Sequence, residues 1–520
     1  MPWMLRRRAR NGPLRRARQA ALDRREFLRR TAQLGGAVAL GGPVLGLGRP
    51  GASGRPAVED FTSMLDQPAK ESPIDSVVVV MMENRSFDHY FGWLADDKKY
   101  IERGRSRYGK RFRVDGKQRQ SFPGSDGTPV ATAPLLANPG EANPYRGCGH
   151  PDPGHQWTQG RAQRDGGFLA PGSGNDLFAL GYYGGDSLPF TSQLAREFTV
   201  FDRWHASVLG PTYPNRAYLH SAQSGDYKDN TLPFATGGYQ WETIWDRLAR
   251  AGVSAGYYYT DLPVLALWGS RLANFQRRIE QYFTDAQQGT LPKVTMVDPA
   301  FLSGNRTDDH PHADIRAGQR FLRDVFAAFA RSKHWRRGAF VVMYDEWGGF
   351  YDHVKPPVLP DDRANPVDVE NFGQAGFRVP ALVASPYARR GYVDHTPYDH
   401  ASVLRFLEWR FLGAPARGPG KTGQTWSLTS RDRHANNLGA SLATDRVDRR
   451  VGVNLDVALL DPSPPCDAVP GAGGGLSVRS PARAAAPEEH ALEQAYEAGW
   501  FERVGHDVRP SPMAREWARG

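Results

Sequence analysis

The chain has 520 residues, and its 40% hydrophobic content and 13 tryptophans exclude a disordered protein and supply a sizeable core. The formal net charge of +10 comes almost entirely from residues 1–30, where eleven arginines face only Asp23 and Glu26. Because the rest of the chain is close to neutral, the basic balance does not indicate binding to nucleic acid or to an anionic membrane.

The N-terminal segment has the features of an export signal. A twin-arginine motif, Arg24-Arg25-Glu26-Phe27-Leu28, precedes a mildly apolar stretch from Thr31 to Leu47 that is rich in glycine and alanine. A transmembrane helix would need ~20 strongly apolar residues, which this stretch does not offer. We therefore predict that residues 1–56 are a signal peptide and leader for the twin-arginine export machinery. The expected location is secreted, periplasmic or cell-wall associated; the alternative is a basic tail.

The first element that bears on chemistry is a run of six apolar residues, 77–82, that leads directly into Glu83 and Asn84. Such a run is typical of a strand buried on both faces, and the carboxyl end of that strand faces the ligand crevice in an open α/β sheet. Both side chains offer oxygen atoms, which suit a divalent cation. The simpler interpretation is a buried strand followed by a polar loop.

The same pattern recurs downstream, where residues 339–344 lead into Asp345 and Glu346, a Gly-Gly turn and His353. Two such strands would bring Glu83, Asn84, Asp345 and Glu346 to one place. Several carboxylates in one place repel one another unless a cation or protons intervene. These four residues are therefore the predicted metal ligands.

These two motifs carry a family resemblance. The ten residues from Glu83 to Gly92 are similar to the signature of the bacterial phospholipase C and acid phosphatase family of phosphoesterases. Asp345-Glu346, with the glycine pair and His353, resembles the second signature, and the resemblance covers roughly residues 74–413. It implies a three-layer α/β/α sandwich around a mainly parallel sheet, as in the alkaline-phosphatase-like superfold, which the repeated strand–helix alternation also favours.

Residues 210–220 are predicted to open a helix, with Pro214 in its first turn and Thr212 at or just before the N-cap. A capping role is the structural interpretation of Thr212. A hydroxyl there also lies near free N–H groups that can hold a phosphate, and the resemblance implies that Thr212 is the nucleophile and completes the metal shell. The Thr-x-Pro-x-Arg spacing resembles the Cys-x-Pro-x-Arg motif of sulfatases. Without Cys or Ser at its first position no formylglycine can form, which favours phosphate esters.

Three histidines are the predicted partners of the phosphate. The resemblance places His155 and His310 in the phosphate pocket, and His353 belongs to the second signature. Their expected role is to donate hydrogen bonds to phosphate oxygens and to protonate the leaving group. The roles of His312 and His400 stay open.

The remaining patterns predict ordinary secondary structure. Helices are expected at 187–198, 241–251, 274–291, 315–332 and 488–504, strands at 253–259, 294–298 and 379–384, and a hairpin near 111–119. The catalytic domain is assigned to residues 57–460, and residues 461–520 to a linker and tail with the short terminal helix. Cys148 and Cys466 could pair in an oxidising compartment.

The predicted function is a secreted, metal-dependent phosphoesterase. The preferred form is a phospholipase C that cleaves phosphatidylcholine-type phosphodiesters through a phospho-threonine, with transient contact to a membrane surface. The alternatives are a broad-specificity acid phosphatase and a non-catalytic binding protein. Oxygen ligands suit Ca, Mg or Mn, and nearby histidines leave Zn and Fe open. The aromatic residues Tyr257–Tyr259 and Trp268 could form a choline cage or belong to the core.

Overall fold

The computed structural model describes residues 61–137, 144–233, 237–301, 306–421, 425–466, 501–504 and 507–510. The predicted export signal over residues 1–56 lies outside the described residues, as does most of the predicted C-terminal helix. Residues 501–504 of that helix instead form a strand, β13, which pairs with β14. In the described residues, no helix has the length and apolar character needed to cross a membrane.

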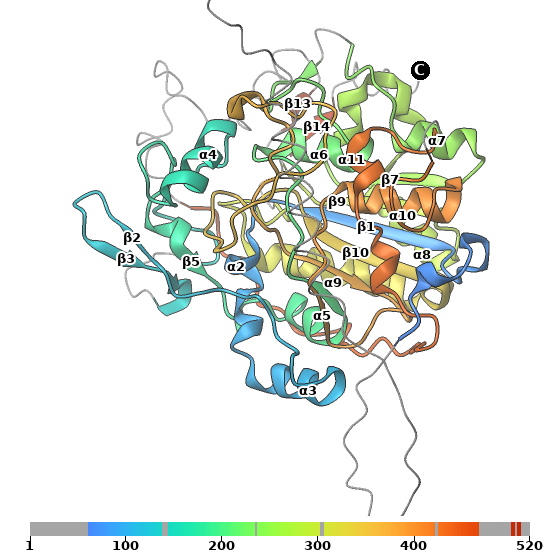
Figure 1. The fold of residues 1–520 in the computed structure, drawn as a ribbon, viewed down its shortest axis with the longest axis horizontal. Helices are drawn as coiled ribbons and strands as arrows, with labels where there is room; N and C mark the ends of the chain where they lie inside the picture. Colours follow the sequence, from blue (N-terminus) through green and yellow to red (C-terminus); the bar gives the residue numbers. More distant parts are fainter. Residues whose placement is uncertain are drawn as a thin grey trace, which may run out of the picture. The chain divides into compact units, whose positions relative to one another are not determined.

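A mostly parallel sheet organises the described part of the chain (Figure 1). Its strand order is β12-β6-β11-β10-β1-β9-β7-β8, and β11 alone among these strands runs antiparallel to its neighbours. The strands are β1 (Ser76–Met82), β6 (Thr199–Phe201), β7 (Ala255–Tyr259), β8 (Gln276–Arg278), β9 (Val294–Asp298), β10 (Gly338–Tyr344), β11 (Ala381–Ala384) and β12 (Tyr392–Asp394).

Helices cover both faces of the sheet (Figure 1), which confirms the predicted α/β class and its three layers. α6, α7, α10 and α11 pack together on one face, and α5, α8 and α9 on the other. The helices are α2 (Phe87–Tyr90), α3 (Lys98–Tyr108), α4 (Trp157–Gly166), α5 (Thr191–Glu197), α6 (Thr212–Ser221), α7 (Ile244–Arg250), α8 (Ile279–Gln288), α9 (Ile315–Arg331), α10 (Ala401–Leu412) and α11 (Ser430–His434).

The two central strands are apolar along their whole length because the sheet is covered on both sides. Every residue of β1 and β10 is buried, and Phe326 and Phe329 of α9 pack their rings against Phe340 of β10. A continuous hydrophobic run is what a doubly covered parallel strand requires. The aromatic residues Tyr257, Tyr258 and Trp268 are buried as well, so they belong to the core.

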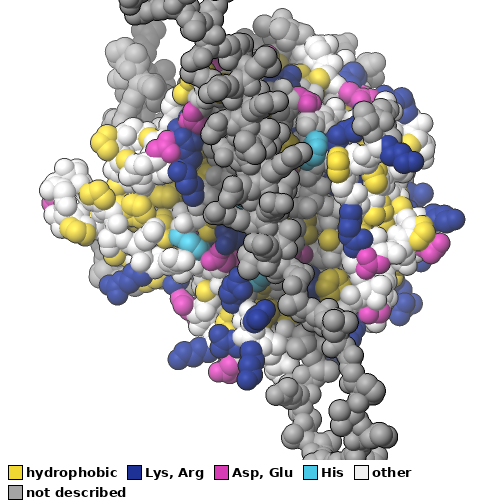
Figure 2. All heavy atoms as spheres, in the orientation of Figure 1, with side chains coloured by type: hydrophobic (Ala, Val, Ile, Leu, Met, Phe, Trp, Pro, Cys, Tyr) yellow, Lys and Arg dark blue, Asp and Glu magenta, His cyan; other side chains and the backbone are white. Residues whose placement is uncertain are grey.

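The hairpin predicted near 111–119 lies elsewhere in the segment that follows α2. This segment contains the helix α3, and its hairpin is formed by β2 (Ser121–Pro123) and β3 (Pro129–Ala131), later in the chain than the expected position near 111–119. A further short parallel pair joins β4 (Ala133–Pro134) to β5 (Gly181–Tyr182). On the face seen in Figure 2, Lys and Arg side chains gather at the lower edge, over α3.

Residues 448–466, here called the C-terminal strap, form neither helix nor strand. The strap is held through its backbone: Arg323 and Arg320 of α9 donate to the carbonyls of Val457 and Leu459, both at 3.2 Å. It ends in a disulfide between Cys466 and Cys148, whose Cα atoms are 5.5 Å apart. The two cysteines considered as a pair from the sequence are therefore bonded.

Candidate active site

The ends of β1 and β10 lie side by side at the carboxyl edge of the sheet. Their parallel register pairs Met82 with Tyr344, so Glu83 and Asp345 leave the sheet from adjacent positions. The Asp345 amide donates to the Met82 carbonyl at 3.0 Å, which continues the ladder past the strand ends. The predicted meeting of the two motifs is thus a direct consequence of strand pairing.

Asn84 and Asp345 form the centre of this site. Asn84 adopts a left-handed backbone conformation with φ of 57°, and its amide donates to Asp345 Oδ1 at 3.0 Å. The Glu346 amide donates to the same oxygen at 2.7 Å. Asn84 Oδ1 and Asp345 Oδ2 are buried and accept no hydrogen bond from the described residues. Buried oxygens without a donor are costly, and a cation is the partner that such a pair suits.

Glu346 is placed by the glycine that follows it. Its Oε2 accepts from the Gly348 amide at 2.7 Å, and its carbonyl accepts from the Arg85 amide at 3.1 Å. Gly348 has a φ of 62°, and a Cβ there would lie 2.2 Å from the Asn84 carbonyl oxygen. Glycine is therefore required for the second motif to pack against the first.

Thr212 is the first residue of α6, and the N-cap is Pro211. The helix has no side-chain cap, so the expected capping role of Thr212 is wrong. Its hydroxyl instead donates to Glu83 Oε2 at 3.3 Å. The loop before the helix is fixed by Asn215, whose Oδ1 accepts from the Val208 amide at 2.9 Å and whose Nδ2 donates to the Gly210 carbonyl at 2.7 Å.

Arg216 is a site residue whose role the sequence did not reveal. It lies one turn after Thr212 on α6, which places both side chains on the same face of the helix. Its guanidinium contacts Glu83 Oε1 at 2.5 Å and Asp298 Oδ1 at 3.1 Å, and its Nε lies 3.9 Å from Asp345 Oδ2. The signal was present in the Thr-x-Pro-x-Arg spacing, because an i, i+4 pair shares one helix face.

The charges of this site do not balance within the described residues. Glu83, Asp345 and Glu346 are almost completely buried, and Arg216 is the guanidinium that contacts the first two. Burial raises the pKa of Asp345 to about 7, assisted by the neighbouring Glu346 and opposed by Arg216. Burial likewise raises the pKa of Glu83. The carboxylates can ionise together only beside a further cation.

The oxygen donors fit a divalent cation. Asn84 and Glu346 donate backbone hydrogen bonds to Asp345, Arg216 contacts both Asp345 and Glu83, and Thr212 contacts Glu83. Oxygen-rich sites favour Mg, Mn or Ca. The unsatisfied oxygens of Asn84 and Asp345 are the structural evidence that these residues can hold such an ion.

His155 and His310 lie together beside this site with Asp152. His155 Nδ1 donates to the Pro153 carbonyl at 2.8 Å, so its Nε2 accepts from Asn84 Nδ2 at 3.4 Å. His310 Nδ1 donates to the Pro311 carbonyl, and its Nε2 lies 3.6 Å from Asp152 Oδ2. One ligand atom from each of the three residues lies within 4.8 Å of the others, a spacing that a proton or a second cation can bridge.

His353 makes its contacts elsewhere. Its Nδ1 bonds Asp88 at 2.6 Å and its Nε2 bonds Asp115 at 3.1 Å, while Arg378 pairs with Asp88 and Asp352, both at 2.8 Å. We call these five residues the arginine-bridged cluster. Among the described residues, His353 makes no hydrogen bond or ion pair with Thr212 or with the predicted metal ligands, so the structure does not group it with the other predicted catalytic residues.

His400 and His312 each donate a hydrogen bond to a backbone carbonyl group. His400 Nε2 donates to the Asp345 carbonyl at 2.6 Å and Trp204 Nε1 donates to His400 Nδ1 at 3.3 Å, which fixes the end of β10. Burial lowers the pKa of His400 to about 3, so it is neutral. His312 Nε2 donates to the His150 carbonyl at 2.9 Å and ties two loops together.

The comparisons with known proteins agree with this geometry. A family model described as the phosphoesterase family matches residues 74–412. The chain belongs to the phosphoesterase family. This confirms the resemblance that the two signatures indicated, and both signatures lie within the matched range.

Individual relatives show the extent of the similarity. Non-specific phospholipase C1 of Arabidopsis thaliana is 34% identical over 360 residues, which covers 64% of this chain and 66% of the relative. Phospholipase C B of Mycobacterium tuberculosis is 29% identical over 412 residues, or 67% of this chain and 75% of the relative. The chain thus spans about two thirds of the plant relative's length.

Among solved structures, a protein of the alkaline phosphatase superfamily from Vibrio parahaemolyticus is similar at 16% identity and a TM-score of 0.25. The similarity covers 52% of this chain and 70% of that one. A score at this level adds nothing to the description of the fold. The family assignment therefore depends on sequence, and the architecture on the sheet described above.

Proposed function

We propose that this phosphoesterase is a metal-dependent phospholipase C that cleaves phosphatidylcholine-type phosphodiesters, with Thr212 as nucleophile. The observation that supports this most strongly is the Thr212 hydroxyl, which lies 3.3 Å from Glu83 at the start of α6. A substrate phosphate at this position meets the free N–H groups and positive end of the helix. The names of the relatives, which are phospholipases C, favour the diester over the monoester.

In the proposed reaction, Thr212 Oγ1 attacks phosphorus in line and forms a phospho-threonine while the phosphorus–oxygen bond to diacylglycerol breaks. The hydroxyl proton leaves toward Glu83, whose Oε2 already accepts it. Protonated His310, whose Nε2 lies 3.6 Å from Asp152 Oδ2, donates a proton to the departing alkoxide. Water then attacks the phospho-threonine and gives a proton to His310, while Glu83 returns its proton to Thr212 Oγ1. The phosphorylated head group is released and the Thr212 hydroxyl is restored.

Glu83, Asn84, Asp345 and Glu346 would hold the divalent ion, with Thr212 completing its shell. The chemistry available from such an ion is a lowered pKa of the hydroxyl and neutralisation of phosphate charge in the transition state. Arg216 pairs with both Glu83 and Asp298 and thereby compensates the repulsion between the two carboxylates. The guanidinium therefore orients the carboxylate that receives the Thr212 proton.

The partners and location are proposed with the same function. Contact with an anionic membrane surface is supported by the basic side chains of α3, Lys98, Lys99, Arg103, Arg105 and Arg107 (Figure 2). Export by the twin-arginine route is supported by Arg24 and Arg25 and by the disulfide, since disulfides persist in oxidising compartments. Replacing both arginines with lysine should stop export, and undiminished secretion would contradict the proposed route.

The test of function compares hydrolysis of p-nitrophenylphosphorylcholine and p-nitrophenyl phosphate by the purified chain, with and without a chelator. Faster cleavage of the choline diester, lost on chelation and restored by a divalent ion, is the expected result. Preference for the monoester would make the chain an acid phosphatase. Hydrolysis of neither substrate by folded, metal-loaded protein would favour the binding-protein alternative.

A further inference from the structure

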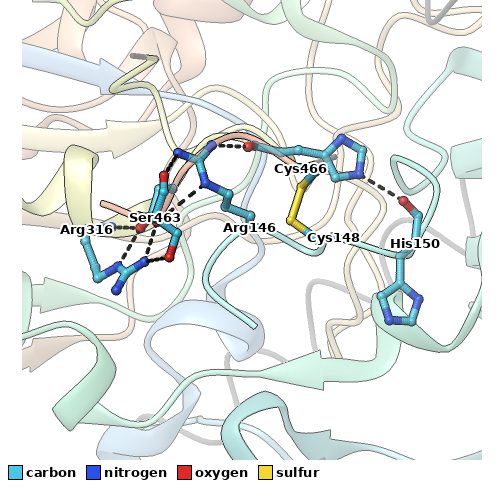
Figure 3. Close-up of a disulfide and its surroundings, with 8 residues drawn as sticks. Arg146, Cys148, His150, Arg316, Ser463 and Cys466 are labelled. Carbon is cyan, nitrogen blue, oxygen red and sulfur yellow. Dashed lines mark hydrogen bonds and ion pairs between the residues drawn. A yellow bond between two sulfur atoms is a disulfide. The ribbon is translucent and has the colours of Figure 1, made fainter. Parts of the chain in front are cut away.

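The Cys148–Cys466 disulfide (Figure 3) lies in the segment that leads to Asp152 and His155. Asp152 and His155 follow Cys148 in the chain by four and seven residues, before α4 begins at Trp157. Gly147 and Gly149 flank Cys148 with φ of 78° and 95°. A segment with such glycines and no regular secondary structure depends on tertiary contacts for its position.

Those contacts come from two other segments of the chain. The first carries His310: Arg146 Nη1 donates to the His312 carbonyl at 3.0 Å, and the Ile315 amide donates to the Tyr145 carbonyl at 3.2 Å. The His312 side chain donates to the His150 carbonyl. The loop with Asp152 and His155 and the loop with His310 are thus bonded to each other on both sides of Cys148.

The second segment is the end of the C-terminal strap. The Ser463 amide donates to Asp314 Oδ2 at 2.8 Å, its carbonyl accepts from Arg146, and its hydroxyl accepts from Arg316 (Figure 3). Arg146 Nε lies 3.6 Å from Asp314, whose side chain is almost completely buried. Arg146, in the loop of Cys148, therefore contacts both other segments, and the disulfide adds a covalent link between this loop and the strap.

We propose that the disulfide, together with Arg146, positions Asp152, His155 and His310 for catalysis, so that the enzyme is nearly inactive with reduced thiols and becomes active when the bridge forms. This inference rests on the proposed function. Bridge formation removes two electrons and two protons from the Cys148 and Cys466 thiols. A disulfide oxidant of the compartment accepts the two electrons and two protons and becomes a dithiol. A chain exported in the folded state would then gain activity only after export.

The experiment measures kcat and KM for p-nitrophenylphosphorylcholine before and after reduction with a phosphine, well below the unfolding temperature of the reduced protein. Reduction should lower kcat by roughly tenfold or more with little change in KM, since small displacements of catalytic groups reduce rates strongly. Reoxidation should restore kcat. Two titrated thiols per chain with an unchanged kcat would overturn the proposal.

Variants separate this local role from general loosening of the strap. Cys148→Ser combined with Cys466→Ser should reproduce the low kcat and make it insensitive to reductant. Arg146→Gln should lower kcat with the bridge intact, and Arg146→Lys should recover part of it. Arg320→Gln is the matched control, because Arg320 holds the same strap at Leu459 and Asp461, away from the histidine loops. An equal loss in Arg320→Gln would overturn the local mechanism.

Hydrogen exchange gives a readout that does not need the assigned activity. Amides of residues 149–155 and 309–314 should exchange faster in the reduced protein, while amides of β1 and β10 stay protected. If the oxidised chain cleaves neither test substrate but shows this exchange pattern, the proposed function fails and the positioning role stands. Unchanged exchange in both loops would refute the positioning role itself.

Discussion

Two groups of acidic residues lie in the segments that follow β1 and β10, and they differ in how their charge is compensated. In the arginine-bridged cluster, Arg378 bonds Asp88 and Asp352, and His353 joins Asp88 to Asp115. The second group is the predicted metal ligands Glu83, Asn84, Asp345 and Glu346, in which Asp345 Oδ2 and Asn84 Oδ1 have no hydrogen-bond donor from the described residues. These two unsatisfied oxygens distinguish the second arrangement, because in the first Arg378 already pairs with both Asp88 and Asp352.

This difference distinguishes buried charges that stabilise the fold from buried charges that can bind a ligand. A buried carboxylate paired with arginine needs nothing further, and removing one partner strands the other. A buried carboxylate whose oxygens are unsatisfied is costly in the apo protein and valuable only when something binds. Substitutions in the arginine-bridged cluster should therefore lower the free energy of unfolding, and substitutions of the predicted metal ligands should lower turnover.

The largest effect expected from this comparison is on turnover. Thr212→Val removes the hydroxyl and keeps the shape, so kcat should fall on the order of 10³-fold or more, as for the loss of other nucleophiles. The unfolding midpoint should hardly change, because the hydroxyl makes one long hydrogen bond to Glu83. Steady-state kinetics and thermal unfolding on the same sample measure both quantities.

Thr212→Ser is the matched control and should retain turnover within roughly tenfold, since it keeps the nucleophilic oxygen. Near-wild-type kcat in Thr212→Val would exclude Thr212 as nucleophile. An equally inactive Thr212→Ser would show that the methyl group, and not the hydroxyl, is what the site requires.

The next effect contrasts two conservative changes, one in each group. Asp352→Asn deprives the buried Arg378 of a charged partner and should lower the free energy of unfolding by about 3–5 kcal/mol. Asp345→Asn removes a charge from a crowded set of carboxylates, so with chelator present it should leave stability unchanged or slightly raised. Denaturant unfolding with a chelator measures the difference between the two variants.

The same two variants should rank in the opposite order when the bound divalent ion is measured. Asp345→Asn should lose bound divalent ion and activity together, whereas Asp352→Asn should keep its metal as long as it is folded. Full metal occupancy in Asp345→Asn would remove that residue from the ligand set. A metal loss in both variants would mean that the two groups form one site and that the comparison is wrong.

Much of this arrangement could be predicted from the sequence because it follows from local pattern. The apolar runs before Glu83 and Asp345 predict buried parallel strands, and parallel strands place their carboxyl ends at one edge. The motif also predicts Thr212 at the start of a helix, where its hydroxyl bonds Glu83 and not the helix backbone. The position of Arg216 was contained in the same motif.

The rest depends on contacts that no local pattern encodes. Arg378 meets Asp88 across 290 residues of sequence, and the disulfide joins residues 318 apart. His353 follows Glu346 closely in the chain, but in the structure it pairs with Asp88 and Asp115 and not with Thr212. These partners could not be predicted from the signature, because the direction of a loop after a strand is set by tertiary packing.

The smallest expected effect is a pH dependence of stability that arises from His353 in the arginine-bridged cluster. Although burial lowers the pKa of His353 and Arg378 opposes its charge, hydrogen bonds to Asp115 and Asp88 raise that pKa to about 9. The folded-state pKa is above the unfolded value of about 6.5, so the protonated form stabilises the fold. This contribution is complete below about pH 6.5 and is lost as the pH rises through about 9.

The expected loss between those limits is on the order of 1–3 kcal/mol, since one pKa unit corresponds to about 1.36 kcal/mol. Denaturant unfolding at intervals from pH 6 to pH 9.5 measures it, with chelator present so that metal binding does not contribute. His353→Gln should flatten the profile in this range, because glutamine keeps hydrogen-bonding capacity but does not titrate. An equally steep profile in His353→Gln would assign the pH dependence to other groups and leave His353 without its role as the titrating link between Asp88 and Asp115.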